Sequence, residues 1–384
     1  MKIAVPREAE AGERRVPMIP ASVDKLVKMG ASVAVEAGLG SSIHVGDAEY
    51  EAAGASIVAD RAALVGEADI VARLNPPPLA EVDLLTAGTI HISHLDPFFN
   101  QELIERLAAR KVTALCMELI PRTTLAQKMD ALSSQASLAG YAAVILAANR
   151  LAKGFPMMMT PAGTLSPSRV FIVGAGVAGL QAIATAKRLG ARVEAFDIRP
   201  VVEEQVKSLG AKFVKIDIGD TGQTEGGYAK QLTREQIQMH RTGIAKICAN
   251  SDVIISTAKL FGRKPPLIIT QEMIAGMKPG SVIVDMAASE HGGNVAGSKL
   301  DEEVVIAGVR IVGLDNLPGH VAVHASQMYS SNLFNLIHHA WDDESKSMKL
   351  DLEEEIMAGA MVTHEGQIVS EMLRKAYSPS EPDA

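Results

Sequence analysis

Arg169-Val-Phe-Ile-Val-Gly174-Ala-Gly176-Val-Ala-Gly179 is the stretch of sequence that decides the fold. A short apolar run leads directly into three glycines spaced as Gly-x-Gly-x-x-Gly, and an apolar helical pattern follows over 180–189. A second strand pattern, 192–196, then ends at an acidic residue, Asp197. This order of strand, turn, helix, strand and acid predicts a βαβ unit that binds a dinucleotide.

Each glycine of the turn has a physical reason in such a unit. Gly174 permits the tight turn, Gly176 lets the backbone approach a pyrophosphate, and Gly179 lets the helix pack close to the strand. The helix N-terminus offers free amides and a positive dipole end to the phosphates. The predicted cofactor-binding residues of this unit are Gly174, Gly176, Val177, Ala178, Gly179, Asp197, Ile198 and Arg199.

The acidic residue favours NAD(H) over NADP(H). A carboxylate at Asp197 can accept hydrogen bonds from the adenosine ribose hydroxyls and would repel a 2′-phosphate. Arg199, two residues further on, is of the type that accommodates a 2′-phosphate, but Asp197 occupies the primary position. The alternative is a glycine-rich turn that binds no ligand.

Outward from this unit, apolar strand patterns alternate with helical patterns in two series. One series runs from residue 2 to residue 112 and the other starts at residue 169. Strands separated by helices predict parallel sheets covered on both faces. We therefore expect an α/β fold of two doubly wound Rossmann-like domains with a cleft between them. The expected domains are 1–137 with 326–384, and 138–325, where 154–161 is a connecting loop.

Composition excludes several classes of protein. The chain has 384 residues, a net charge of −8 and no run of Lys and Arg, so nucleic acid is not an expected partner. Cys116 and Cys248 stand apart in apolar runs, which predicts buried thiols in a reducing compartment and no metal site. The start lacks a signal-peptide pattern, and the apolar stretch 138–151 is shorter than the ~20 residues of a membrane span. The prediction is a cytoplasmic protein.

The first series has its own glycine pair, Gly38-Leu-Gly40, which we interpret as a turn and not as a second nucleotide site. A more informative segment is Arg122-Thr-Thr-Leu-Ala-Gln127-Lys-Met-Asp130-Ala-Leu-Ser133. Its simplest interpretation is a loop followed by a helix, with Asp130 or a serine as the helix cap and Arg122 on the surface. The residues alone do not separate this structural role from a catalytic one.

At this point the chain resembles a known family. It is similar to the NAD(H)-binding component, domain I of the alpha subunit, of proton-translocating nicotinamide nucleotide transhydrogenase, which is related to alanine dehydrogenase. Besides the segments already quoted, the resemblance extends over nearly the whole chain. It rests on Val5-Pro-Arg-Glu8, Glu13-Arg-Arg-Val16, Phe155-Pro-Met-Met-Met-Thr160, Glu225-Gly-Gly-Tyr228, Gly292-Gly-Asn294 and Asn316-Leu-Pro318.

The resemblance implies roles for particular residues. The family's hydride-transfer loop matches Arg122, Gln127, Asp130 and Ser133, which would hold the nicotinamide ring and its carboxamide in the cleft. Two further segments match parts of the family that lie against the cofactor. These are Gly227 with Tyr228, in a mobile loop that closes over the nucleotide, and the strand end at Ala258. Lys259, which follows Ala258, is also expected to contact the cofactor, although the family commonly has an uncharged residue there.

The resemblance also implies partners. Such a chain passes a hydride from NADH to NADP⁺ held on another subunit, and a membrane-spanning subunit couples this transfer to proton translocation. It would be a homodimer, cytoplasmic and attached to the inner membrane through its partner subunits. Departures from the family pattern at Leu125, Ser137, His240 and Lys259 affect the expected cofactor affinity and loop geometry.

Two alternatives stay open. Amino-acid oxidation, as in alanine dehydrogenase, needs a cationic side chain for the substrate carboxylate and a proton-handling group beside the amine. Relatives of that enzyme carry an Arg, a Lys and a His in the segments that match 13–16, 74–76 and 90–94, and transhydrogenases also carry the His. Arg15 and His94 match that pattern, whereas the Lys position is Leu74, which argues against an amino-acid substrate. The other alternative is an NAD-responsive module without catalytic activity.

Overall fold

A computed structural model describes residues 1–216 and 233–378, without the side chains of some residues at the start of α9. The chain divides into two compact units. Unit 1 comprises Met1–Gln135 and Val321–Ala384, and unit 2 comprises Ala136–His320. The expected exchange points were 137/138 and 325/326, so the chain crosses back into unit 1 five residues earlier than expected.

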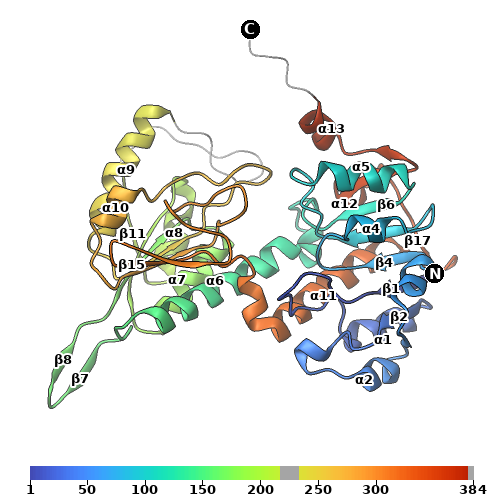
Figure 1. The fold of residues 1–384 in the computed structure, drawn as a ribbon, viewed down its shortest axis with the longest axis horizontal. Helices are drawn as coiled ribbons and strands as arrows, with labels where there is room; N and C mark the ends of the chain where they lie inside the picture. Colours follow the sequence, from blue (N-terminus) through green and yellow to red (C-terminus); the bar gives the residue numbers. More distant parts are fainter. Residues whose placement is uncertain (217–232, 379–384) are drawn as a thin grey trace, which may run out of the picture. The chain divides into compact units, whose positions relative to one another are not determined.

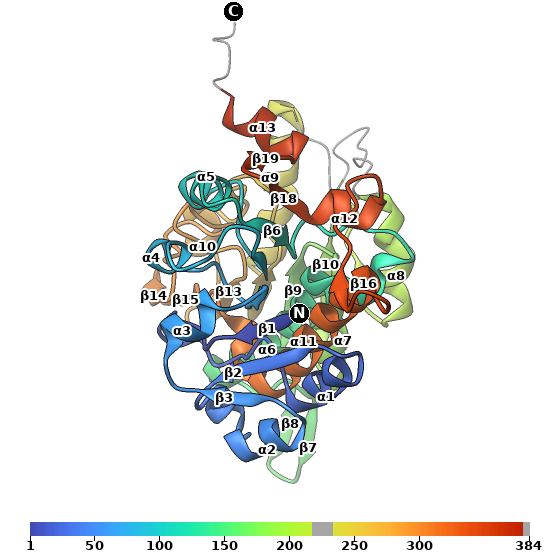
Figure 2. The ribbon, with the colours of Figure 1, turned by 90° about the vertical axis from the view of Figure 1, so that its right-hand side faces the viewer.

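Unit 1 is built on an eight-stranded sheet of order β19-β18-β6-β5-β4-β1-β2-β3. Figure 2 labels β19, β18 and β6 in the upper part of this sheet and β1, β2 and β3 in the lower part. The six strands β3-β2-β1-β4-β5-β6 are parallel, whereas β18 and β19 are antiparallel additions from the C-terminal segment. The strands are β1 Lys2–Val5, β2 Ser32–Glu36, β3 Ser56–Val58, β4 Ile70–Ala72, β5 Ile90–Ser93, β6 Thr113–Cys116, β18 Met361–His364 and β19 Gln367–Ile368.

Helices cover this sheet and bury a core of aliphatic side chains. The C-terminal helix α11 (Ala322–Ala340) packs beside α1 (Pro20–Lys28), where the Ser330 hydroxyl donates to the Ser22 hydroxyl at 2.7 Å. Leu333, Leu336 and Ile337 of α11 are fully buried in the core. The remaining helices and the small β16–β17 ribbon are α2 Asp47–Ala52, α3 Arg61–Gly66, α4 Leu79–Val82, α5 Gln101–Ala109, α12 Glu355–Ala360, α13 Glu371–Tyr377, η1 Ser41–Ile43, η2 Ala126–Met129, β16 Trp341–Asp342 and β17 Ser347–Met348.

Unit 2 is built on a seven-stranded sheet of order β11-β10-β9-β12-β13-β15-β14, in which only β14 is antiparallel. Both sheets therefore contain the doubly wound strand order 3-2-1-4-5-6 in their parallel part. This confirms the predicted fold class of two Rossmann-like α/β domains. The strands are β9 Arg169–Val173, β10 Arg192–Phe196, β11 Lys212–Phe213, β12 Val253–Ser256, β13 Val282–Asp285, β14 Glu303–Ile306 and β15 Val309–Val312.

Close packing explains one glycine of unit 2 that carries no ligand function. A Cβ on Gly140, in α6 (Ala131–Arg150), would overlap the backbone carbonyl oxygen of Ala178 in α7 (Val177–Arg188). Only glycine permits the two helices to approach this closely. The other helices of unit 2 are α8 Glu203–Ser208, α9 Arg234–Cys248, α10 Gln271–Ala275, η3 Pro200–Val202 and η4 Leu317–Val321.

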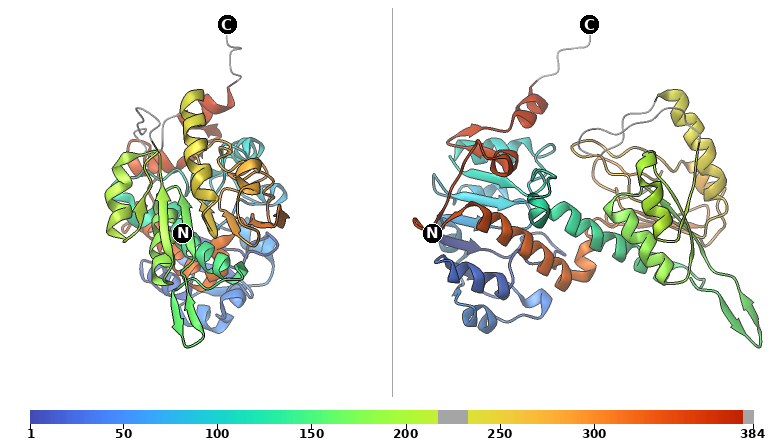
Figure 3. Two further views of the ribbon diagram at one scale, coloured as in Figure 1. Left: turned by 90° about the vertical axis from the view of Figure 1, so that its left-hand side faces the viewer. Right: turned by 180° about the vertical axis from the view of Figure 1, so that it is seen from behind.

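The expectation of a plain loop over 154–161 is wrong. This segment contains β7 (Met158–Thr160), which pairs antiparallel with β8 (Gly163–Leu165) in a hairpin. Figures 1 and 3 show the hairpin as a long arm that extends away from the sheet of unit 2. All six of its strand residues are exposed, so no burial pattern in the sequence indicated strands there.

Helix α6 is longer than the apolar stretch from which it was predicted, because it begins at Ala131. In the described part of the chain it is the single helix long and apolar enough, by length and composition alone, to cross a membrane. Half of its most apolar window is buried, and Ala143, Val144 and Ala147 pack into the core of unit 2. Such burial is typical of the core helix of a globular domain.

Candidate functional site

The predicted phosphate-binding turn lies at the switch point of the sheet in unit 2. From β9 the chain proceeds to β10 on one side and returns to β12 on the other, so a crevice is expected at the carboxyl ends of β9 and β12. Gly174 follows β9 with a φ of +92°, a conformation that favours glycine. A Cβ there would lie 2.5 Å from the hydroxyl oxygen of Thr257, which follows β12.

The other two glycines of the turn differ in their surroundings. A Cβ on Gly179 would overlap the Gly174 carbonyl oxygen and lie 2.9 Å from its carbon, so this glycine lets α7 press against the turn. At Gly176 the nearest atom to a Cβ would be the Arg199 guanidinium at 3.9 Å. A Cβ at Gly176 would therefore make only an ordinary van der Waals contact, and the amides at the start of α7 have no partner within the helix. A pyrophosphate fits this cradle.

Asp197 lies at the carboxyl end of β10 and is almost buried. One carboxylate oxygen accepts from the Ala175 amide in the glycine turn at 2.8 Å, which ties the acid to the turn. Arg199 donates to the same carboxylate through its backbone amide, Nε and Nη2, at 2.8, 2.9 and 2.8 Å. These four bonds fill the carboxylate. A ribose hydroxyl must therefore displace guanidinium bonds to reach Asp197.

Ala258 and Lys259 follow β12, beside the glycine turn. The Thr257 amide donates to Val173 O at 2.8 Å, and its hydroxyl lies 3.2 Å from the carbonyl oxygen of Gly174. Ala258 is partly buried and Lys259 is exposed. The structure thus places both residues at the same edge of the sheet as Gly174 and Asp197. Thr257, which supports the turn, was not among the predicted residues, since nothing in the local sequence distinguishes it from other polar residues at strand ends.

The segment Arg122–Ser133 lies in unit 1, and Asp130 caps the helix that follows it. The Asp130 carboxylate accepts from the Ser133 amide at 2.8 Å and from the Ser133 hydroxyl at 2.6 Å. This is the N-cap geometry that the simplest interpretation required. Arg122 and Gln127 are exposed, whereas Asp130 and Ser133 are partly buried.

Helix α11 holds this segment from behind. Asn332 donates to the Lys128 carbonyl oxygen at 2.9 Å and accepts from the Ser134 hydroxyl at 2.7 Å. Ala126 and Met129 are buried in the core of unit 1. The backbone that carries Gln127 and Asp130 is therefore fixed on its inner side. Sequence reasoning missed Asn332 because its partners lie about 200 residues earlier in the chain.

Comparisons with known proteins identify the family of the chain. Models of the alanine dehydrogenase/PNT N-terminal and C-terminal domains match residues 4–139 and 143–371. The chain belongs to the alanine dehydrogenase/PNT family. It is 45% identical over 376 residues to the first part of the NAD(P) transhydrogenase alpha subunit of Rhodospirillum rubrum, and the match covers 96% of this chain and 98% of the relative.

Two further comparisons rank the branches of the family. A crystal structure of transhydrogenase from Sinorhizobium meliloti has a TM-score of 0.86 and 41% identity, covering 96% of this chain and all of that chain. An alanine dehydrogenase of Halomonas elongata is 29% identical over 384 residues, covering 98% of this chain and 97% of that protein. The resemblance to the transhydrogenase branch of the alanine dehydrogenase/PNT family is confirmed.

The residues at the positions compared with alanine dehydrogenase, Arg15, Leu74 and His94, have partners or are buried within unit 1. Arg15 donates to both carboxylate oxygens of Glu13, at 3.0 and 2.6 Å, and to the Gln135 side chain at 3.1 Å. Leu74, at the Lys position, is completely buried. His94 lies 3.6 Å from the Glu118 carboxylate. A buried leucine occupies the Lys position, and a substrate carboxylate would compete with Glu13 for Arg15.

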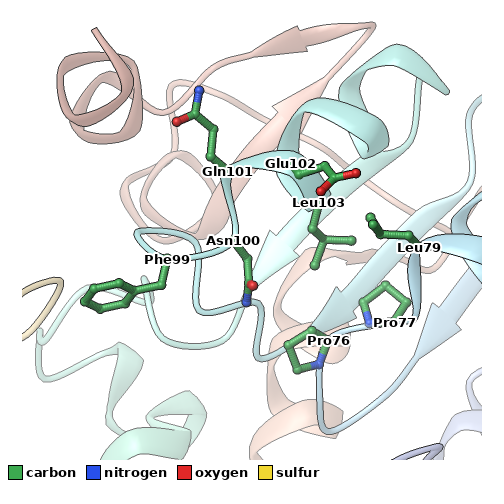
Figure 4. Close-up of a pocket in the computed structure, with 8 residues that line it drawn as sticks. All are labelled: Pro76, Pro77, Leu79, Phe99, Asn100, Gln101, Glu102 and Leu103. Atoms are coloured by element: carbon green, nitrogen blue, oxygen red, sulfur yellow. The ribbon is translucent and has the colours of Figure 1, made fainter. Parts of the chain in front are cut away.

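Unit 1 has two surface hollows whose lining includes none of the predicted catalytic or cofactor-binding residues. One, of about 230 Å³, is bounded by Pro76, Pro77, Leu79, Phe99 and the first turn of α5 (Figure 4). The other, of about 310 Å³, is lined by Glu8, Glu10 and the 75–78 segment. The second one is open and acidic, which disfavours a phosphate-bearing ligand.

The remaining predicted residues have different outcomes. Gly227 and Tyr228 lie outside the described residues, as does the side chain of His240. Cys116 and Cys248 are buried free thiols, as predicted, and burial raises the pKa of Cys248 to about 12. Gly38 and Gly40 form a turn after β2, in which the Leu39 amide donates to Glu36 O at 3.0 Å.

Proposed function

We propose that this chain is the NAD(H)-binding component of a proton-translocating transhydrogenase. It binds NADH and exchanges a hydride with NADP⁺ bound on a partner subunit, and a membrane-spanning subunit couples the exchange to proton translocation. The R. rubrum relative is named as one part of an alpha subunit, which supports the existence of such partner subunits. The chain acts as a homodimer in the cytoplasm, at the inner membrane through those partners.

The observation that carries this proposal is the glycine turn of unit 2. Gly174 and Gly179 are packed too tightly for a side chain, whereas a Cβ on Gly176, beside the first amides of α7, would make only an ordinary contact with the Arg199 guanidinium. A structural turn would have no reason to keep a glycine at this position. A turn that receives a pyrophosphate would, because a Cβ there occupies the space of the ligand.

The residues of the chain have distinct tasks in this function. The α7 amides bind the pyrophosphate, Asp197 binds the adenosine ribose, and Arg122, Gln127, Asp130 and Ser133 orient the nicotinamide ring and its carboxamide. Bound NAD(H) supplies the hydride at its nicotinamide ring. Direct transfer between two nicotinamide rings requires no proton transfer from the protein, so amide, guanidinium, carboxylate and hydroxyl groups that orient the ring suffice.

NAD(H) is favoured over NADP(H) by the state of Arg199. Its guanidinium is committed to Asp197 through Nε and Nη2 and is thereby neutralised. A 2′-phosphate would approach a filled carboxylate and an arginine that already has its counter-ion. Both effects disfavour the additional phosphate.

An amino-acid dehydrogenase is the second candidate, because the fold and Arg15 are shared with that branch. Leu74 argues against it, since the buried leucine cannot bind a carboxylate. A module that binds NAD(H) without catalysing a reaction is the third candidate.

One experiment separates the three candidates. The purified chain receives NADH and an NADP analogue together with the purified NADP-binding partner component, and in a second mixture it receives NADH, pyruvate and ammonia. We expect turnover only in the first mixture, followed by absorbance of the reduced analogue. Turnover in the second mixture would show a dehydrogenase, and binding without turnover in either would show a module.

A further inference from the structure

Asn294 is a fully buried amide that follows β13 in unit 2. Its side-chain oxygen accepts from the Ser256 hydroxyl at 2.8 Å and from the Ala258 amide at 3.1 Å. Its side-chain nitrogen donates to the carbonyl oxygens of Ala258 and Pro266, both at 2.9 Å. All four hydrogen-bonding positions of the amide are therefore used, and three of them go to Ser256 and Ala258 at the end of β12.

The segment that carries Asn294 is itself held in place by hydrogen bonds to Asp285. The buried carboxylate of Asp285, the last residue of β13, accepts from the amides of Ala287 and Val295 at 3.0 and 3.1 Å. A Cβ on Gly293 would overlap that carboxylate, which explains the glycine. The hydrogen bonds of Asn294 thus link the end of β12 to the segment that follows β13, and we call this link the Asn294 bracket.

The segment 256–258, which Asn294 binds, is also joined to the phosphate-binding turn. Thr257 separates Ser256 from Ala258, and its amide and hydroxyl bind the carbonyl oxygens of Val173 and Gly174. The position of Ala258 relative to Gly174 is consequently set by two anchors, Thr257 towards the turn and Asn294 towards β13. Removing either one frees the backbone beside the crevice.

A dinucleotide bound at this switch point has to extend in a defined direction. If the Gly174 turn receives the pyrophosphate and Asp197, after β10, receives the adenosine ribose, the other half of the ligand crosses to the β12 side of the sheet. The wall that it meets there is the backbone of Ala258 and Lys259. This step rests on the proposed function.

We propose that Asn294 is a positioning residue for the nicotinamide half of the bound dinucleotide. It touches no reacting atom and acts by holding Ala258 and Lys259 against the crevice. Loss of this bracket should therefore weaken ligands that possess a nicotinamide half and leave ligands that end at the diphosphate unaffected. A residue that only stabilised the domain would affect both kinds of ligand equally.

The test compares NADH with ADP, which lacks the nicotinamide half. Asn294→Asp keeps an acceptor for Ser256 and for the Ala258 amide but loses both donor bonds. We expect the Kd of NADH to rise at least tenfold and the Kd of ADP to change less than twofold, by isothermal titration calorimetry of the full chain. Asn250→Asp is the matched control, because Asn250 is exposed and precedes the amino-terminal end of β12, whereas the candidate site lies at the carboxyl ends of the strands. It should change neither Kd.

A second variant covers the case in which the new carboxylate prevents folding. Ser256→Ala removes one bond to Asn294 and introduces no charge, and it should raise the Kd of NADH severalfold without changing that of ADP. Asp197→Asn, in contrast, should weaken both ligands. Equal weakening of NADH and ADP in folded Asn294 and Ser256 variants, or no weakening of NADH, overturns the inference alone. An unaltered chain that binds neither ligand overturns the proposed function, and the inference with it.

Discussion

Two glycines in one turn should respond to the same substitution in different ways. Gly179→Ala places a Cβ against the backbone of Gly174, 2.9 Å from its carbonyl carbon. Carbon atoms pack at about 3.5–4.0 Å, so α7 must move by roughly 1 Å. Gly176→Ala meets nothing nearer than 3.9 Å and has an allowed φ of −77°. The first change disturbs packing, and the second disturbs only the space for a ligand.

The magnitudes follow from this difference. Overpacking costs about 1–3 kcal/mol, and a clash with backbone belongs at the upper end, about 2–3 kcal/mol, because no side-chain rotation relieves it. Replacing glycine within a helix offsets about 1 kcal/mol of this. We therefore expect Gly179→Ala to lower the free energy of unfolding by roughly 1–2 kcal/mol, and Gly176→Ala to change it by less than about 1 kcal/mol. Gly176→Ala should nevertheless raise the Kd of NADH at least ~tenfold, a loss of about 1.4 kcal/mol in binding.

Urea unfolding followed by circular dichroism gives the free energies, and fluorescence titration gives the Kd. Gly66→Ala is a suitable control, since Gly66 belongs to unit 1 and its Cβ would meet only an ordinary contact at 3.4 Å. A Gly176→Ala variant that binds NADH as tightly as the unaltered chain would refute the pyrophosphate cradle. A Gly179→Ala variant of unchanged stability would refute the close packing of α7 on the turn.

Three more predictions concern charged residues. Asp197→Asn releases Arg199 from its carboxylate and removes the charge that repels a 2′-phosphate, so the preference for NADH over NADPH should fall at least ~tenfold in fluorescence titrations; an unchanged preference would contradict this role. Asp130→Ala removes a helix cap and should cost about 1 kcal/mol in urea unfolding. Asp130→Asn keeps the cap, so a fall in hydride transfer with unchanged stability would show a role beyond capping, and an unchanged rate would leave only the cap. Burial alone would raise the pKa of Glu118 above its ordinary value of 4.5. The nearby His94 and the hydrogen bonds to the carboxylate have the larger effect and lower the pKa to about 2. The ionised carboxylate therefore contributes about 3 kcal/mol above pH 4.5 that is lost as the pH falls towards 2. The difference in free energy of unfolding between the unaltered chain and Glu118→Gln, measured by urea unfolding, should shrink between pH 7 and pH 3. A difference that stays constant would refute the contribution of the ionised carboxylate.

The sequence was most informative where a strand is buried on both faces and bounded by glycine. The predicted strands 169–173 and 192–196 coincide with β9 and β10. β9 is a continuous apolar run from Val170 to Val173 that ends at the glycine turn, whereas in β10 the partly buried Glu194 stands between apolar residues. The capping role of Asp130 was also foreseeable, because the polar side chain directly precedes a long apolar helix.

Other features could not be predicted because they depend on contacts between distant parts of the chain. The strand β18 has no strong local pattern and forms because β6 offers it an edge about 250 residues earlier in sequence. The bracket between Ser256 and Asn294 spans 38 residues. Each of these residues alone resembles any polar residue at the end of a strand, so only the folded chain shows their pairing.

The two sheets share one strand order but differ, within the described residues, in the turn that follows their first strand. In unit 2 the first strand is followed by Gly174 and by amides at the start of α7 that have no acceptor within their own helix. In unit 1 the first strand is followed by Glu8, whose carboxylate accepts from the amides of Leu74 and Asn75, after β4, at 2.7 and 3.2 Å. Unit 1 thus fills its own switch point with a carboxylate, whereas in unit 2 the proposed function assigns the corresponding position to a pyrophosphate. We therefore expect the turn after the first strand, and not the fold, to decide which unit binds a dinucleotide.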